Sequence, residues 1–129
     1  MAVAFEAAIL CDDIRQEVNG KQILIGAYTG NIIFSGFPAA GQFFVFAKTE
    51  SLPVGQHSLS VRLRFANKDI GTVQGEVSIE TQGGLWLPLN TPPISFPGEG
   101  ELEAQYIDSE GKWITFLSIP IRGGQVPGT

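Results

Sequence analysis

An Asn-Gly pair at positions 19 and 20 separates two apolar, strand-like runs near the start of the chain. The first run begins at Phe5, and the second reaches from Gln22 to Tyr28. Asn-Gly between such runs is the strongest short-range signal for a β-hairpin, because both residues adopt positive φ at little cost. This segment therefore predicts an antiparallel hairpin, and it constrains the fold class more than any other feature of the chain.

Period-two alternation continues in the rest of the chain, and no segment sustains the i, i+3, i+4, i+7 spacing of an amphipathic helix. The alternation is clearest over residues 58–65, where Leu, Val and Phe alternate with Ser and Arg. A second hairpin is predicted over residues 101–121, with its turn at 108–111. About eight short strands joined by turns favour an all-β, single-domain antiparallel β-sandwich, immunoglobulin-like or C2-like. A closed barrel is the alternative.

The first hairpin makes two more detailed predictions. Four residues of its first strand share one parity and are expected to face the core: Phe5, Ala7, Ile9 and Cys11. Ile14 has the opposite parity, so we expect a β-bulge at Asp12 and Asp13 that restores the register. Residues 22–29 are apolar on both faces, which is typical of a central strand covered on both sides, or of a dimer contact.

Size, charge and cysteine content narrow the function classes. The chain has 129 residues, enough for one domain with a substantial core, and we expect this domain at residues 1–122, followed by a flexible tail at 123–129. The net charge of −5 would repel phosphates, which disfavours nucleic-acid binding. One cysteine excludes an intrachain disulfide, and no segment has the pattern of a signal peptide or a membrane span. We therefore expect a cytoplasmic protein.

Three short patterns resemble those of an uncharacterised family of small bacterial proteins, classified only as a domain of unknown function. They are Leu10-Cys11-Asp12-Asp13-Ile14-Arg15, Val18-Asn19-Gly20-Lys21 and Ile25-Gly26-Ala27-Tyr28. The C-terminal hairpin, residues 98–121, is similar in outline. The resemblance implies a bacterial cytoplasmic β-sandwich, and it carries over no catalytic residue.

Carboxylates in two places are the candidates for a metal site. Asp12 and Asp13 are neighbours on an extended segment, so their side chains point to opposite sides unless a bulge brings them together. Ca²⁺ takes roughly six to eight oxygen ligands, and Asp108 and Glu110 could add some if both turns lie at the same end of the molecule. The alternative is that Asp12 or Asp13 accepts backbone hydrogen bonds or pairs with Arg15. We expect no bound cofactor.

The residues that could carry catalysis are few and far apart in the sequence. Cys11 is expected to be buried as a small apolar group, and His57, the one histidine, to lie exposed in a turn. A Cys-His pair would require these distant residues to meet, and Ser58 points away from His57 on an extended strand. We therefore expect a protein that is not an enzyme.

Aromatic and basic side chains are the candidates for contact with a partner. Trp86 lies in a segment bordered by Gly and Pro that could be exposed, with core packing as the alternative for it and for Trp113. Arg62 and Arg64 share the outward face of one strand, where they could meet an acidic partner or pair with Glu101 and Glu103 of a neighbouring strand.

These observations favour a non-catalytic protein-interaction or assembly module that binds a protein partner or a second copy of itself through a strand edge or an end loop. The strand predicted at residues 22–28, apolar on both faces, favours a homo-oligomer. The alternative function is the binding of Ca²⁺ or of a small ligand such as a carbohydrate.

Overall fold

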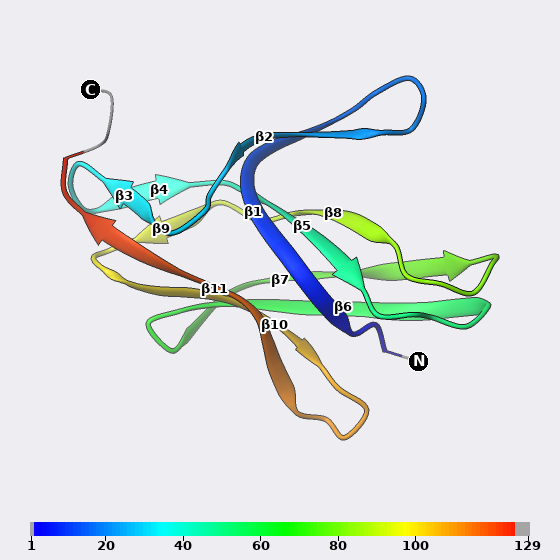
Figure 1. Ribbon diagram of the computed structural model, residues 1–129. Coiled ribbons are helices and arrows are strands. Elements are labelled where there is room, and N and C mark those ends of the chain that lie inside the picture. Colours follow the sequence, from blue (N-terminus) through cyan, green and yellow to red (C-terminus); the bar gives the residue numbers. More distant parts are fainter. Residues whose placement is uncertain (1, 126–129) are drawn as a thin grey trace.

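The computed structural model describes residues 2–125 of the chain. Within this range the backbone forms eleven strands and no helix, which confirms the all-β class (Figure 1). In chain order the strands are β1 (Phe5–Gln16), β2 (Gln22–Ala27), β3 (Ile32–Phe34), β4 (Ala39–Gly41), β5 (Phe44–Thr49), β6 (Gly55–Phe65), β7 (Lys68–Ile79), β8 (Trp86–Asn90), β9 (Ile94–Phe96), β10 (Gly100–Ile107) and β11 (Trp113–Gly123).

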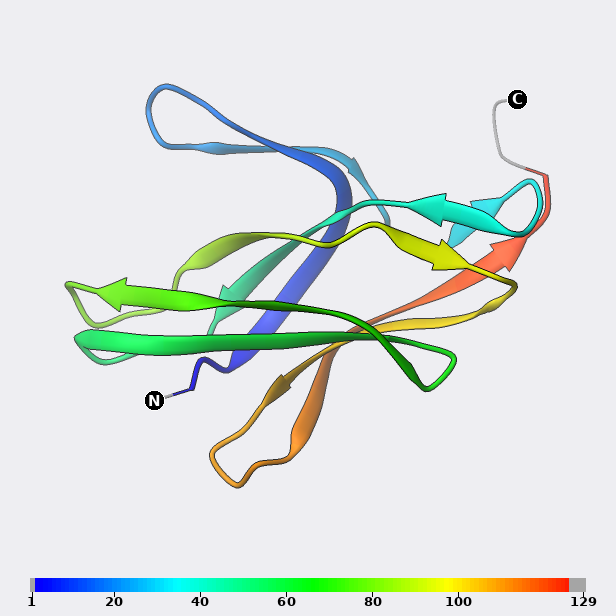
Figure 2. The same cartoon turned by 180° about the vertical axis from the view of Figure 1, so that it is seen from behind.

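The strands form three sheets. A four-stranded sheet has the order β2-β1-β5-β8, a five-stranded sheet has the order β3-β11-β10-β6-β7, and β4 pairs with β9 alone. All neighbours are antiparallel except β3 and β11, which run parallel. Figures 1 and 2 show that the β1–β2 hairpin and the β10–β11 hairpin extend toward opposite ends of the molecule, at the top and the bottom of both views.

One core lies between the two larger sheets. Both contribute alternate side chains to it, including Leu10 and Val45 from the four-stranded sheet and Val61 and Leu102 from the five-stranded sheet. Phe96 is fully buried and contacts three other phenylalanine rings: Phe34, Phe43 and Phe65. Burying each such side chain contributes about 1.5–3 kcal/mol to folding, so this shared core holds the sheets together.

The predicted β-bulge lies elsewhere in β1. Pairing with β2 keeps one register from Cys11 to Gln16, so the prediction of a bulge at Asp12 and Asp13 was wrong. The register of β1 against β5 shifts instead between Phe5 and Ala7, where Glu6 is the extra residue. Because a one-residue shift exchanges the two faces of a strand, the residues that follow the bulge have the opposite parity to that expected.

One of the two alternatives for residues 22–29 was a central strand covered on both sides, and this alternative was wrong. The strand β2 lies at the edge of the four-stranded sheet, and Ile23 and Ile25 are each 43% exposed. The number of strands also exceeds the predicted eight or so, because β3, β4 and β9 have three residues each and are too short to show alternation.

The C-terminal boundary can be followed as far as residue 125. β11 extends to Gly123, whose amide donates to Glu99 Oε2 at 2.8 Å, and the Gly124 amide donates to the carbonyl of Phe34 at 3.0 Å. Residues 126–129 of the predicted tail lie outside the described range. Over residues 2–125 we find no helix with the length and apolar character needed to cross a membrane.

Candidate functional site

The outward side of the four-stranded sheet carries a continuous set of apolar side chains, here called the apolar face. Because directly paired residues project to the same side of a sheet, the register places its members in rows across the strands. These rows are Ala7, Lys48 and Trp86; Ile9, Phe46 and Pro88; Ala27, Cys11, Phe44 and Asn90; Ile25 and Asp13; and Ile23 and Arg15.

Several large apolar members of this face are in contact with solvent. Ile9 is 37% exposed and Trp86 is 39% exposed, and the two isoleucines of β2 are more exposed still. The Trp86 ring stacks on Phe46 with a centroid distance of 4.8 Å, so the aromatic part of the face presents a flat surface. The bulge near Phe5 creates this arrangement, because it turns Ile9 outward and Leu10 inward.

The outward side of the five-stranded sheet has the opposite character. Its paired positions are mostly hydroxyl, amide and charged side chains: Gln56, Ser58, Ser60, Arg62, Arg64, Thr72, Gln74, Glu76, Ser78, Glu101, Glu103, Gln105, Thr115 and Ser118. An antiparallel sheet with one face on the core normally has a polar second face, as this one does. The apolar face of the other sheet departs from that pattern.

Two ion pairs border the apolar face. Lys48 pairs with Glu6 at one end, and Arg15 Nε lies 2.9 Å from Asp13 Oδ2 at the other. The hydrogen bond from Arg15 lowers the pKa of the Asp13 carboxyl, which therefore stays ionised. The charged members of this border thus balance one another in sign.

A compact polar contact fixes the base of the β1–β2 hairpin. The Tyr28 hydroxyl donates to Asp12 Oδ1 at 2.5 Å, and the other oxygen of Asp12 lies over Gly26. Burial of the ring raises the pKa of Tyr28, and the hydrogen bond to Asp12 raises it further. Asp12 is therefore engaged in holding the hairpin at its base.

The four carboxylates considered for a metal site are not brought together. Asp12 and Asp13 belong to the β1–β2 hairpin, whereas Asp108 and Glu110 lie in the β10–β11 turn at the other end of the molecule (Figure 1). Asp108 Oδ1 accepts hydrogen bonds from the amides of Glu110 and Lys112 at 2.9 and 2.8 Å. Among residues 2–125, no group of three or more His, Cys, Asp or Glu side chains is positioned to hold a metal ion.

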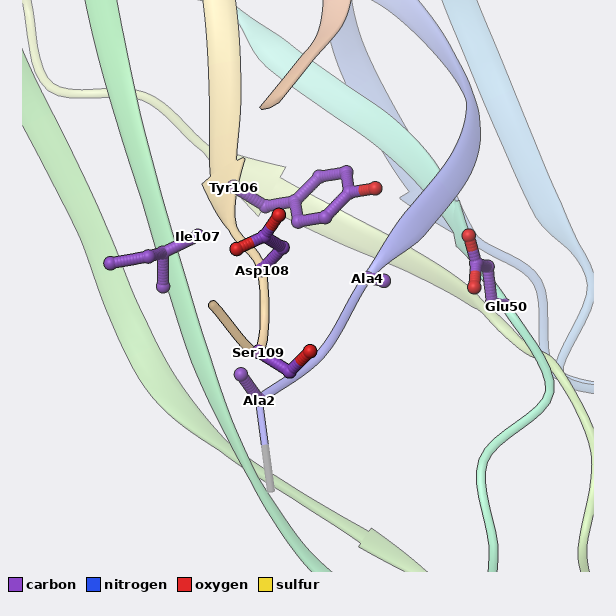
Figure 3. A pocket seen from close by; sticks show the side chains of 7 residues that line it. All are labelled: Ala2, Ala4, Glu50, Tyr106, Ile107, Asp108 and Ser109. Carbon is purple, nitrogen blue, oxygen red and sulfur yellow. The ribbon is translucent and has the colours of Figure 1, made fainter. Parts of the chain in front are cut away.

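A groove of about 580 Å³ lies between the N-terminal segment and the end of β10 (Figure 3). It is lined by Ala2, Ala4, Glu50, Tyr106, Ile107, Asp108 and Ser109. In the view of Figure 3, Glu50 and Asp108 lie on opposite sides of the segment that carries Ala4, so the two carboxylates do not converge. Burial, with the negative charges of Glu50 and Asp108, raises the pKa of Tyr106, which keeps its phenol protonated.

The two candidate nucleophilic or basic side chains are both buried. Cys11 is fully buried, as predicted, although the register places it on the outward side of β1 and not on the inward side that we expected, and burial raises the pKa of its thiol. His57 is 3% exposed, so the prediction of an exposed turn histidine was wrong. It lies inside β6 on the same inward parity as Leu59, and its Nε2 donates to the carbonyl of Pro53 at 2.7 Å. The Cys11 thiol donates instead to the carbonyl of Phe44 at 3.7 Å, so the two side chains have different partners.

The arginines proposed as partner contacts are largely engaged within the chain. Arg62 donates to Gln105 Oε1 at 2.7 Å, and its guanidinium lies 4.2 Å from the centre of the Trp113 ring. Arg64 Nε lies 2.9 Å from Asp69 Oδ1 as an ion pair, although its N–H is not aimed along a hydrogen bond. The acidic partner of Arg64 is thus Asp69 of β7, and not the Glu101 or Glu103 expected as the alternative.

Arg62 and Trp113 also line a smaller hollow of about 310 Å³ on the polar side of the five-stranded sheet. Trp113 is half-buried beneath Arg62, while Trp86 is exposed on the other sheet. Of the three residues proposed for partner contact, Trp86 is therefore the one that is exposed, at 39%. The apolar face around it was not predicted, because its rows depend on pairing between strands distant in the sequence.

The fold and its surfaces define an all-β protein in which one outer sheet face is polar and the other is apolar and exposed. The chain belongs to a family of unknown function (DUF6941), whose profile matches residues 6–122. A comparison with curated proteins gives no match. The membership agrees with the resemblance seen in the sequence, which was to a family of unknown function.

Proposed function

We propose that this protein is a non-catalytic interaction or assembly module of the bacterial cytoplasm, built as an immunoglobulin-like or C2-like sandwich. The apolar face of the four-stranded sheet is its binding surface. Trp86, stacked on Phe46, is the aromatic anchor, and Ile9 and Ile25 extend the surface toward the hairpin. Aromatic anchors surrounded by aliphatic side chains are typical of the residues that dominate binding energy in protein interfaces.

The single observation that supports this function is the contrast between the two outer faces. A sheet face that stays in water gains nothing from Ile, Phe and Trp, and exposed apolar patches of several hundred Å² mark interaction sites or aggregation hazards. The polar outer face of the five-stranded sheet is the internal reference for a surface that does remain in water. Covering the apolar face with another protein surface removes the hazard.

A photo-crosslinking experiment tests the proposal. The photoreactive residue benzoylphenylalanine is placed at Ile25 on the apolar face, or at Ser78 on the polar face as a matched control. On illumination in cells and in cell extract, we expect protein adducts from position 25 and none from position 78. Benzoylphenylalanine at Ile9 gives a second position on the apolar face. If neither Ile25 nor Ile9 gives a protein adduct, the proposed function is wrong.

A further inference from the structure

We propose that the occupant of the apolar face is a second copy of this chain, packed face to face about a two-fold axis. This inference rests on the proposed function, since it names the partner that covers the same surface. In a two-fold interface each copy presents the same patch, so the patch must be complementary to itself in shape and charge. The structure meets both requirements on this face.

The charge of the face is the first argument. The chain has 13 acidic and 8 basic residues, so copies repel each other wherever the acidic excess gathers. On the border of the apolar face two acidic residues pair with two basic ones, Glu6 with Lys48 and Asp13 with Arg15. The whole net charge of −5 therefore lies elsewhere on the chain. The apolar face is the outer sheet face that two copies can bring together without like-charge repulsion.

The positions of the ion pairs add to this argument. Lys48 and Glu6 lie at one end of the face, and Arg15 and Asp13 at the other, on the rows that contain Ile23 and Ile25. A two-fold axis that lies in the interface plane, across the line joining the two ends, sets one end of a copy against the opposite end of its partner. The Lys48–Glu6 pair of one copy then faces the Arg15–Asp13 pair of the other at each end of the interface. Charges of opposite sign can therefore meet at both ends.

The area of the face is the second argument. Its four strands have 12, 6, 6 and 5 residues. At about 3.3 Å per residue and about 4.8 Å between strands, their outer face measures roughly 460 Å² in projection. A stable interface buries roughly 800 Å² of accessible surface on each partner, and accessible surface over projecting side chains exceeds the projected area. The face therefore supplies most of what a dimer needs, and the hairpin around Val18 extends it.

The packing mode is one that sheets commonly adopt. Two sheet faces stack about 10 Å apart with their side chains interdigitated. Ile9 and Phe46 project from one row and Ile25 from the second row along, and the row between them has small side chains at Ala27 and Cys11. Large and small side chains that alternate on one surface can interlock with the same surface of a second copy.

Sedimentation equilibrium of the purified chain tests the inference with two disruptive variants and one control. Ile25→Glu and Ile9→Glu each add a negative charge to the apolar face, and Ser78→Glu adds the same charge to the polar face. We expect the wild type and Ser78→Glu to dimerise alike, and both isoleucine variants to weaken dimerisation by about tenfold or more. Far-ultraviolet circular dichroism checks that each variant is folded, which is expected because both side chains lie on an outer surface.

Two results would overturn the inference. One is a wild type that sediments as a monomer up to high micromolar concentration, and the other is a dimer whose stability neither isoleucine variant changes. Crosslinking of the purified chain through benzoylphenylalanine at Ile25 gives a second readout that needs no charged variant, and adducts should map to the apolar face of the partner copy. A monomeric wild type that still crosslinks to another protein in cells would refute self-association while leaving the proposed function standing.

Discussion

The carboxylate of Asp12 occupies the space where any other residue at position 26 would place its Cβ. A Cβ at Gly26 would lie 2.3 Å from Asp12 Oδ2, and Gly26 has a φ of +68°, in the left-handed region. Asp12 is held there by the hydroxyl of Tyr28. The three residues therefore act together to set the angle at which the β1–β2 hairpin leaves the sheet.

Replacement of Gly26 by alanine should destabilise the fold. The left-handed φ costs about 1–2 kcal/mol for an L-residue, and the clash with Asp12 adds to it, so Gly26→Ala should lose about 2 kcal/mol or more. Urea unfolding followed by circular dichroism measures the loss. Gly20→Ala is the matched control, since Gly20 has a φ of +87° and open space around it. This variant should lose only the stability that corresponds to the left-handed φ. Equal losses in the two variants would contradict the account.

The contact between Tyr28 and Asp12 predicts a dependence of stability on alkaline pH. The pKa of Tyr28 is raised from its ordinary value of 10.0 by burial and by Asp12, so the folded state holds the proton more tightly than the unfolded state. The stabilisation is fully present below about pH 10 and is lost as pH rises above it. Tyr28→Phe should therefore lose less stability than the wild type between pH 9 and 11. Parallel slopes of unfolding free energy against pH for the two proteins would refute this.

The aromatic cluster around Phe96 should be the most sensitive part of the core. Phe96 is fully buried and contacts Phe34, Phe43 and Phe65, so Phe96→Ala should cost about 3–5 kcal/mol through lost burial and the cavity that remains. Val54 is 65% exposed, and Val54→Ala should change stability by less than about 0.5 kcal/mol. Chemical unfolding of both variants gives the comparison, which fails if the two losses are similar.

Cys11 should be protected from modification in the folded protein. Its side chain is fully buried and burial raises its thiol pKa, so Ellman's reagent should react slowly in buffer and fully once urea unfolds the chain. A second thiol introduced as Val54→Cys should react at once in buffer, which gives an internal reference for an exposed cysteine. Rapid reaction of the wild type under native conditions would show that Cys11 is accessible.

Local alternation predicted the parts of the fold that depend on one strand alone. Leu59, Val61, Leu63 and Phe65 are buried as their parity requires, because each strand with one face on a core must separate apolar from polar residues. The same parity continued back by one step would have placed His57 inside. The prediction that His57 is exposed was therefore wrong because the strand was predicted to begin after it, whereas β6 begins at Gly55.

The position of the bulge could not be deduced from the same pattern. Residues 7–11 are apolar at every position, so either parity satisfies a hydrophobic face, and a one-residue slip at Glu6 leaves no trace in the sequence. The apolar face was hidden for a related reason. Its rows join β1 to β5 and β5 to β8, and these neighbours follow from packing between distant segments.

The central claim is that the apolar face is covered in the assembled protein, and the exposure of Trp86 reports on it most directly. Trp86 is one of two tryptophans, so Trp113→Phe leaves it as the sole tryptophan, whose fluorescence can be excited selectively. We predict that acrylamide quenching of Trp86 falls as protein concentration rises through the dimerisation range, and that adding Ile25→Glu abolishes this fall. Quenching that stays constant at every concentration, at the level of an exposed tryptophan, would contradict the claim.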